Sequence, residues 1–174
     1  MALLPIITAP DPRLKIKARP VAAVDAAVRR LMDDMLETMR EAIGIGLAAP
    51  QVGVAKRVIV LDVAREGEKP APMMLANPEI LWRSPELTSG SEGCLSLPEH
   101  YAEVTRPEKI RLRYLDYQNE IREIEASGLL ATCIQHEIDH LDGVLFVDHI
   151  STVKRGMILR KLAKSKRGRA LVPA

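Results

Sequence analysis

The segment His136-Glu137-Ile138-Asp139-His140 places two imidazoles and a carboxylate at a spacing that suits one metal ion. Residues four positions apart lie on one face of a helix, so the side chains of His136 and His140 can reach a single divalent cation. Glu137 starts about 100° further around the helix axis, and it can approach a water activated by that metal without being a ligand. This is the chemistry of the H-E-x-x-H pattern. The alternative is an ordinary solvated helix face.

A third metal ligand must come from elsewhere, because a catalytic site keeps three protein ligands and leaves one position for water. Cys133 lies one turn before His136, but its side chain leans toward the helix N-terminus. Cys94 lies in the segment EGCLS at 92–96, where Gly93 permits close approach of another chain. We favour Cys94 as the third ligand, and a Cys94–Cys133 disulfide is the alternative. The full set of candidates is Cys94, Cys133, Glu92, Asp116, Asp148 and His149.

The segment GIGLAAPQVG at 44–53 combines small residues with one amide side chain. Its glycines, Gly46 among them, allow a substrate backbone to lie close to the chain. Gln51 is placed to donate an amide hydrogen bond to a developing oxyanion. A tight helix-to-strand connection is the alternative interpretation. A nucleotide-binding loop is not supported, because no Lys follows the glycines and G-x-G-x-x-G is absent.

These side chains must be positioned by a fold that 174 residues, 47% apolar and 28% charged, can build as a single globular domain over 1–174. Asp25 is the expected N-cap of a helix to about Ala42, which Gly44 and Gly46 should end. Ser127 is the expected N-cap of a central helix through about Leu141 that carries H-E-x-x-H. Strands are expected at 58–61, 73–76, 80–82, 110–114 and 121–124. The sequence therefore predicts an α+β fold with mixed or antiparallel sheets around a central helix.

Charge is distributed unevenly along the chain. Residues 151–174 carry eight basic side chains and no acid, whereas residues 1–150 carry a net charge of −6. We expect a basic C-terminal helix that packs on the body through Val153, Met157, Ile158 and Leu162. A charge of this kind indicates either a polyanionic partner or a solvated helix face.

The ends of the sequence and its cysteines bear on the compartment. Residues 1–24 contain four prolines and are expected to form an extended arm over the body. No apolar run reaches the roughly 18 residues of a membrane span, and the N-terminus lacks the pattern of a signal peptide. Two cysteines cannot build a multi-disulfide framework. We therefore expect a cytoplasmic protein that makes no membrane contact and acts as a monomer.

The three segments taken together resemble the signature motifs of the peptide deformylase family, in the same order. They are GIGLAAPQVG at 44–53, EGCLSLPE at 92–99 and QHEIDHLDG at 135–143, and the resemblance covers about residues 5–163. It implies a compact α+β metalloenzyme that hydrolyses the N-formyl group of N-formylmethionyl nascent peptides and releases formate. The basic C-terminal helix is similar to the extension with which longer bacterial members dock on the ribosome near ribosomal RNA at the peptide exit.

The resemblance also implies roles for individual residues. The metal ligands would be Cys94, His136 and His140, and Glu137 would be the general acid and base. Gln51 and the backbone N–H of Leu95 would hold the oxyanion. The family typically uses Fe2+, with Zn2+, Ni2+ or Co2+ able to occupy the site, although affinity order alone would favour zinc over iron. The peptide and its methionine would meet Ile45, Gly46, Gly93, Leu129 and Cys133.

Tyr101, Gly90 and Thr132 depart from residues common in the family, so we expect a slightly altered pocket.

Two further interpretations of the function remain at the level of sequence. A zincin-type metalloprotease would share H-E-x-x-H but would not need EGCLS. A binding protein without catalytic activity would use the basic tail as its functional part.

Overall fold

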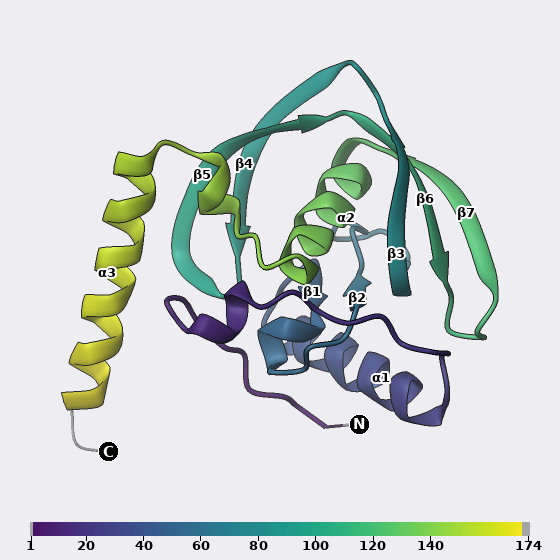
Figure 1. Cartoon of the computed structure of the whole chain (residues 1–174), viewed down its shortest axis with the longest axis horizontal. Coiled ribbons are helices and arrows are strands. Elements are labelled where there is room, and N and C mark those ends of the chain that lie inside the picture. Colours follow the sequence, from purple (N-terminus) through teal and green to yellow (C-terminus); the bar gives the residue numbers. More distant parts are fainter. Residues whose placement is uncertain (1, 172–174) are drawn as a thin grey trace.

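A computed structural model describes residues 2–171 of the chain, with side chains to residue 166. Figure 1 shows a central helix enclosed by curved strands, with one further helix below them and a third helix standing at the side. The elements in chain order are η1 (Pro12–Lys15), α1 (Ala26–Glu41), β1 (Gly46–Ala48), η2 (Ala49–Val52), β2 (Val58–Leu61), β3 (Met73–Arg83), β4 (Leu87–Cys94), β5 (Leu97–Pro107), β6 (Lys109–Leu115), β7 (Ile121–Ser127), α2 (Gly128–Leu141), η3 (Phe146–His149) and α3 (Thr152–Leu171).

The strands form two antiparallel sheets. The larger has five strands in the order β1-β2-β3-β6-β7, and the smaller is the hairpin β4-β5. The expected α+β class is confirmed. The hairpin was missed, since β4 carries the Ser- and Gly-rich sequence LTSGSEGC and lies mostly at the surface, which leaves no apolar alternation to mark it. The segments 73–76 and 80–82 are one strand, β3, with a register irregularity between Ala76 and Glu79.

Strand β2 is buried on both faces, which explains its uninterrupted Val-Ile-Val-Leu sequence. Ile59 and Leu61 join a core with α2, in which Ile134 and Ile138 are buried. Val58 and Val60, which point to the opposite face of β2, join a second core with α1. The two helices thus pack on opposite faces of the sheet, and this fixes α2 against the central strands.

Helix α1 begins as predicted, because the Asp25 carboxylate accepts a hydrogen bond from the backbone N–H of Val28. Its end lies within one residue of the predicted one, with Ala42 as the C-cap. Glu41 is the last helical residue, and Ile43 adopts a left-handed φ of 58° before either glycine is reached. Ala42 was expected on the apolar face of this helix, but the structure leaves it exposed.

Helix α2 starts after Ser127, as expected, although the Ser127 side chain makes no capping hydrogen bond. It ends at Leu141, and Gly143 then adopts a φ of 74°. A Cβ at Gly143 would lie 2.5 Å from the backbone oxygen of Lys15, so only glycine lets the N-terminal arm pass there.

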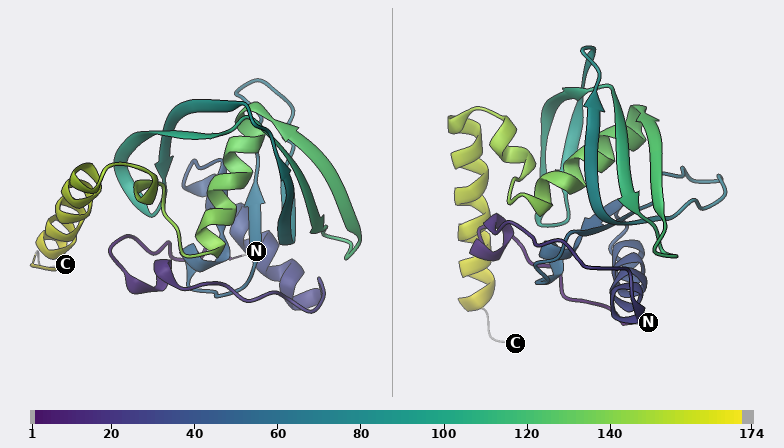
Figure 2. Two further views of the ribbon diagram at one scale, coloured as in Figure 1. Left: turned by 45° about the horizontal axis from the view of Figure 1, so that its top comes forward. Right: turned by 45° about the vertical axis from the view of Figure 1, so that its right-hand side comes forward.

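The N-terminal arm joins the three motif segments. Backbone N–H groups of Ile7, Ala9 and Ala18 donate hydrogen bonds to the carbonyl oxygens of Gln51, Ser96 and Leu141, at 2.7, 2.8 and 2.8 Å respectively. In both views of Figure 2 the arm runs across the base of the molecule below α2. The arm therefore tethers segments that lie far apart in the sequence.

Helix α3 contacts the body through two of the four residues predicted to do so, Ile158 and Leu162. Leu162 is buried, and Ile158 and Leu159 pack beside it on the third core cluster. Val153 and Met157, expected on that face, are 71% and 46% exposed. The side chains of Arg167 and Arg169, part of the basic tail, lie outside the described residues. Among residues 2–171, no helix combines the length and the apolar character that crossing a bilayer requires.

Candidate metal centre

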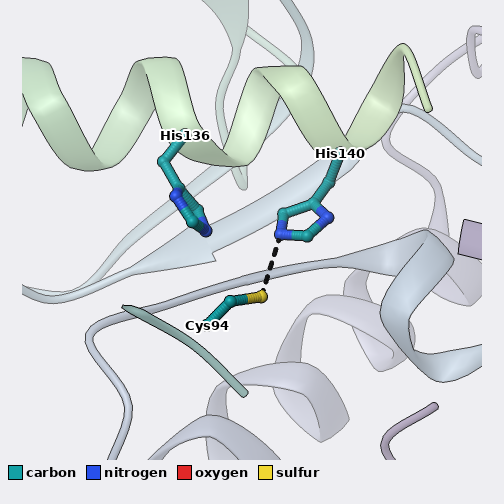
Figure 3. Close-up of side chains that lie close together, drawn as sticks. All are labelled: Cys94, His136 and His140. Atoms are coloured by element: carbon teal, nitrogen blue, oxygen red, sulfur yellow. Dashed lines mark hydrogen bonds between the residues drawn. The ribbon is translucent and has the colours of Figure 1, made fainter. Parts of the chain in front are cut away.

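Helix α2 and the end of strand β4 bring three metal-ligating side chains together. His136 and His140 project from one face of α2 toward Cys94, as Figure 3 shows. One ligand atom from each residue lies within 4.8 Å of the other two. Cys94 Sγ is 3.3 Å from His140 Nε2, close to the roughly 3.5 Å between sulfur and nitrogen ligands of one tetrahedral metal ion. The donor set and its spacing therefore fit a single divalent ion.

The other candidates for the third ligand have different partners. Cys133 Sγ contacts the carbonyl oxygen of Ile45 at 3.7 Å, and both cysteines are free thiols. Asp116 accepts hydrogen bonds in the turn between β6 and β7, and Asp148 pairs with Lys15 and Arg155. The remaining two, Glu92 and His149, belong to a network behind the site.

Glu92 fixes the orientation of His136. The Glu92 carboxylate accepts a hydrogen bond from His136 Nδ1 at 2.9 Å and a bidentate pair from Arg106 at 2.7 and 2.9 Å. Burial opposes ionisation of Glu92, but the hydrogen bonds from Arg106 and His136 outweigh it and hold its pKa at about 2. Since a carboxylate only accepts, the proton of His136 resides on Nδ1, and Nε2 is left to face Cys94.

The two histidines have different electrostatic surroundings. Burial opposes the charged form of His136, but the hydrogen bonds that His136 donates to Cys94 and Glu92 raise its pKa. Burial and the neighbouring His136 lower the pKa of His140, which favours the neutral imidazole that binds metals. Binding of a metal to such a site is accompanied by proton release.

Glu137 lies beside the candidate ligands without belonging to their cluster. Its Oε1 atom is 3.9 Å from His136 Nε2, and burial raises the pKa of its carboxyl to about 7. Within the described residues, the buried Oε2 atom has no hydrogen-bond partner. A Cβ at Gly46 would lie 2.7 Å from Glu137 Oε1, so glycine there is what admits the carboxylate. These features suit a group that exchanges a proton with a water.

Gln51 approaches the site from the first of the three motifs, GIGLAAPQVG, in η2. Its Oε1 accepts a hydrogen bond from the backbone N–H of Ala48, which fixes the amide so that Nε2 points toward the centre. Nε2 donates to Ser96 Oγ at 3.0 Å and lies 3.4 Å from Cys94 Sγ. Leu95 follows Cys94 in the turn between β4 and β5. An amide donor and a turn backbone thus lie next to the candidate ligands.

A cavity of about 470 Å³ opens onto this centre, a size typical of small-ligand sites. Its walls include all the residues predicted to meet the substrate, namely Ile45, Gly46, Gly93, Leu129 and Cys133. Tyr101 and Thr132 also line it, whereas Gly90 is not among its lining residues. Burial raises the pKa of the Cys133 thiol, so this side chain adds no charge to the cavity wall.

Three further members of the site, Arg106, Ser96 and Asp139, received no definite role from the sequence. Arg106 lies outside all three motifs, and Ser96 and Asp139 lie within them without a spacing that indicates a partner. Asp139 accepts hydrogen bonds from Arg106 and from His149, both at 2.8 Å. Only the ion pairs of Arg106 in β5 with Glu92 in β4 and Asp139 in α2 would have revealed these roles, and no single sequence segment contains those pairs.

Fold and site together describe a small α+β protein whose helix α2 and a cysteine thiol form a candidate metal centre. Comparison with known proteins identifies the family. The family model for polypeptide deformylase matches residues 3–156, and the chain belongs to that family.

Individual relatives cover nearly the whole chain. The peptide deformylase of Methylocella silvestris is 64% identical over 168 residues, which are 95% of this chain and 86% of that protein. The crystal structure of peptide deformylase from Ehrlichia chaffeensis has a TM-score of 0.92 at 41% identity and covers 98% of this chain and 100% of its own. A second structure of the Ehrlichia chaffeensis enzyme, in complex with actinonin, has a TM-score of 0.92 at 43% identity and covers 96% of this chain and 99% of its own.

Proposed function

We propose that this protein is a metal-dependent hydrolase that removes the N-formyl group from N-formylmethionyl nascent peptides during N-terminal maturation. The observation that carries the proposal is the cluster of Cys94, His136 and His140 with the Glu137 carboxyl beside it, at the wall of a cavity. Family membership supports the same activity and leaves the metalloprotease and binding-protein interpretations without support.

Cys94, His136 and His140 would hold one divalent ion, which supplies Lewis acidity to a water and to the formyl oxygen. A thiolate with two imidazoles suits Fe2+, Zn2+, Ni2+ and Co2+, and we propose Fe2+ because the family typically uses it. The ligands lie in segments that a single domain of residues 1–174 holds together.

Glu137 is proposed as the general acid and base. Its carboxylate takes a proton from the attacking water, whose oxygen forms a bond to the formyl carbon. The carbon–nitrogen bond then breaks, and Glu137 passes the proton to the departing amine. Gln51 Nε2 and the backbone N–H of Leu95 donate to the oxyanion as it forms. The products are formate and a peptide with a free amino terminus.

The cavity supplies the recognition of methionine in this proposal. Ile45, Leu129 and Cys133 form apolar walls, and a flexible thioether adapts well to an irregular apolar space. Gly46 and Gly93 let the peptide backbone approach. The basic helix α3 is proposed to dock on ribosomal RNA near the exit tunnel. Nascent peptides emerge there, so we propose that the protein acts in the cytoplasm. We also propose that it acts as a monomer.

The direct test is hydrolysis of formyl-Met-Ala-Ser by protein loaded with Fe2+ under argon, with every product identified. We expect formate and intact Met-Ala-Ser. Formyl-Met together with Ala-Ser would instead reveal peptide-bond cleavage and support the metalloprotease interpretation. Absence of any cleavage would contradict both hydrolytic functions.

A further inference from the structure

The short helix η3 contacts the candidate metal centre from behind by two routes. The buried Phe146 ring stacks on His136, with ring centroids 6.3 Å apart and an interplanar angle of 24°. Three residues later, His149 Nε2 lies 2.8 Å from Asp139 Oδ2. Because a carboxylate only accepts, His149 is the donor in this bond.

The bond from His149 is the outer end of a continuous chain of charge-assisted hydrogen bonds. Asp139 Oδ2 accepts from His149 and also from Arg106 Nη1, each at 2.8 Å. Arg106 holds Glu92 by two bonds, and Glu92 accepts from His136 Nδ1. Donors and acceptors alternate without a conflict from the surface to the metal-facing imidazole.

Burial increases from the outer to the inner end of this chain. The side chains of Arg106 and Glu92 are each 6% exposed, whereas Asp139 is 24% and His149 36% exposed. Arg106 is shared between two carboxylates, so its direction depends on where the Asp139 carboxylate is held. His149 supplies the second donor that holds Asp139 against rotation toward solvent.

We propose that His149 is a positioning residue for the metal centre, acting through Asp139, Arg106 and Glu92 on His136. The inference deepens the proposed function and rests on it for the identity of the site. A direct partner of a metal-ligating histidine typically changes metal affinity 10–100-fold. His149 acts through three intermediate side chains, so its removal has a smaller effect.

The test uses full-length protein loaded with Co2+, and it follows metal transfer to an excess of chelator by loss of the Co2+ visible absorption. His149→Leu removes the donor, and His149→Gln retains an N–H donor near the position of Nε2. Arg155→Met is the matched control, because it breaks the ion pair of the adjacent Asp148 and leaves His149 unchanged. Thermal unfolding of the metal-free proteins establishes that each variant is folded.

We expect His149→Leu to release Co2+ about threefold faster or more, with His149→Gln and Arg155→Met near the wild-type rate. The Co2+ spectrum should shift in the Leu variant alone. Equal release rates for His149→Leu and wild type would overturn the proposal, as would equal acceleration by His149→Leu and Arg155→Met. Since no formyl peptide enters the assay, this result is independent of whether deformylation occurs.

Discussion

Glu137 combines properties that are rarely found together, a buried carboxyl with a pKa near 7 and one oxygen without a partner among the described residues. A base with that pKa accepts a proton efficiently near neutral pH. Glu137→Gln keeps the size of the side chain but cannot accept the proton. We predict near-normal metal content with a kcat for formate release lowered about 10²-fold or more. Turnover like that of the wild type would remove Glu137 from the mechanism.

Gly46 determines where the Glu137 carboxylate can lie. A Cβ there would approach Glu137 Oε1 to 2.7 Å and Cys133 Sγ to 2.9 Å, so a side chain must move. We predict that Gly46→Ala lowers kcat by about tenfold or more, because a misplacement of 1 Å costs on the order of 10²-fold. The control is Gly156→Ala, a methyl added on α3 away from the cavity. Equal kcat values for the Gly46 variant and wild type would show that the carboxylate position is not critical.

Residue spacing alone predicted the two histidines and the carboxylate, since 3.6 residues per turn settles which helical side chains share a face. Spacing left six candidates for the third ligand, of which Cys94 was favoured because it lies in EGCLS beside Gly93. The structure brings Cys94 to the histidines and gives Glu92 a hydrogen bond with His136. No local pattern contains that pairing, because it depends on how β4 packs beside α2.

At the scale of elements, predictions succeeded where one interaction dominates. The cap at Asp25 and the apolar run of β2 are of this kind. The hairpin β4-β5 was not predicted, because its stability comes from pairing between strands and not from apolar residues within β4. The end of α1 was predicted to within one residue, but the residue that turns left-handed after it is Ile43 and not one of the expected glycines.

Asp148 connects three elements at the base of α3. Its carboxylate accepts from Lys15 Nζ, from the backbone N–H of Leu145 and from Arg155 Nε, at 2.6, 2.8 and 2.8 Å. Burial opposes ionisation of Asp148, but these donors outweigh it and lower its pKa. A carboxyl whose folded-state pKa is lowered stabilises the protein above its unfolded pKa of about 4 and loses that contribution below it.

We therefore predict that Asp148→Asn lowers the free energy of unfolding by about 1 kcal/mol at pH 7. The difference from wild type should shrink as the pH falls below about 4. Chemical denaturation of both proteins across a pH series measures it. A difference that stays constant down to acidic pH would assign the effect to packing and not to the charge of Asp148.

For the whole molecule, the separation of a basic tail from an acidic body is the feature that bears on a large partner. Leu162 anchors α3, and Lys166 Nζ donates to the carbonyl oxygen of Thr8 at 3.1 Å. Figures 1 and 2 both show α3 at one side of the molecule, away from α2. A polyanion bound along α3 would leave the cavity accessible to a peptide.

Removal of residues 164–174 should therefore leave formate release from a short peptide nearly unchanged, because the cavity and the candidate ligands lie in residues 42–140. The same truncation should weaken co-sedimentation with ribosomes at low salt, and binding of the full chain should fall steeply as salt rises. If the truncated and full-length proteins pellet equally across a salt series, the basic residues beyond 163 do not mediate ribosome binding.

If one metal ion held by Cys94, His136 and His140 makes this protein a deformylase, its activity must follow the occupancy of that site. Titration of metal-free protein with Fe2+ under argon, with formate release from formyl-Met-Ala-Ser as the readout, tests it most directly. We expect no activity without metal and a linear rise that saturates at one ion per chain. Formate release by the metal-free protein, or a rise that continues well beyond one ion per chain, would contradict it.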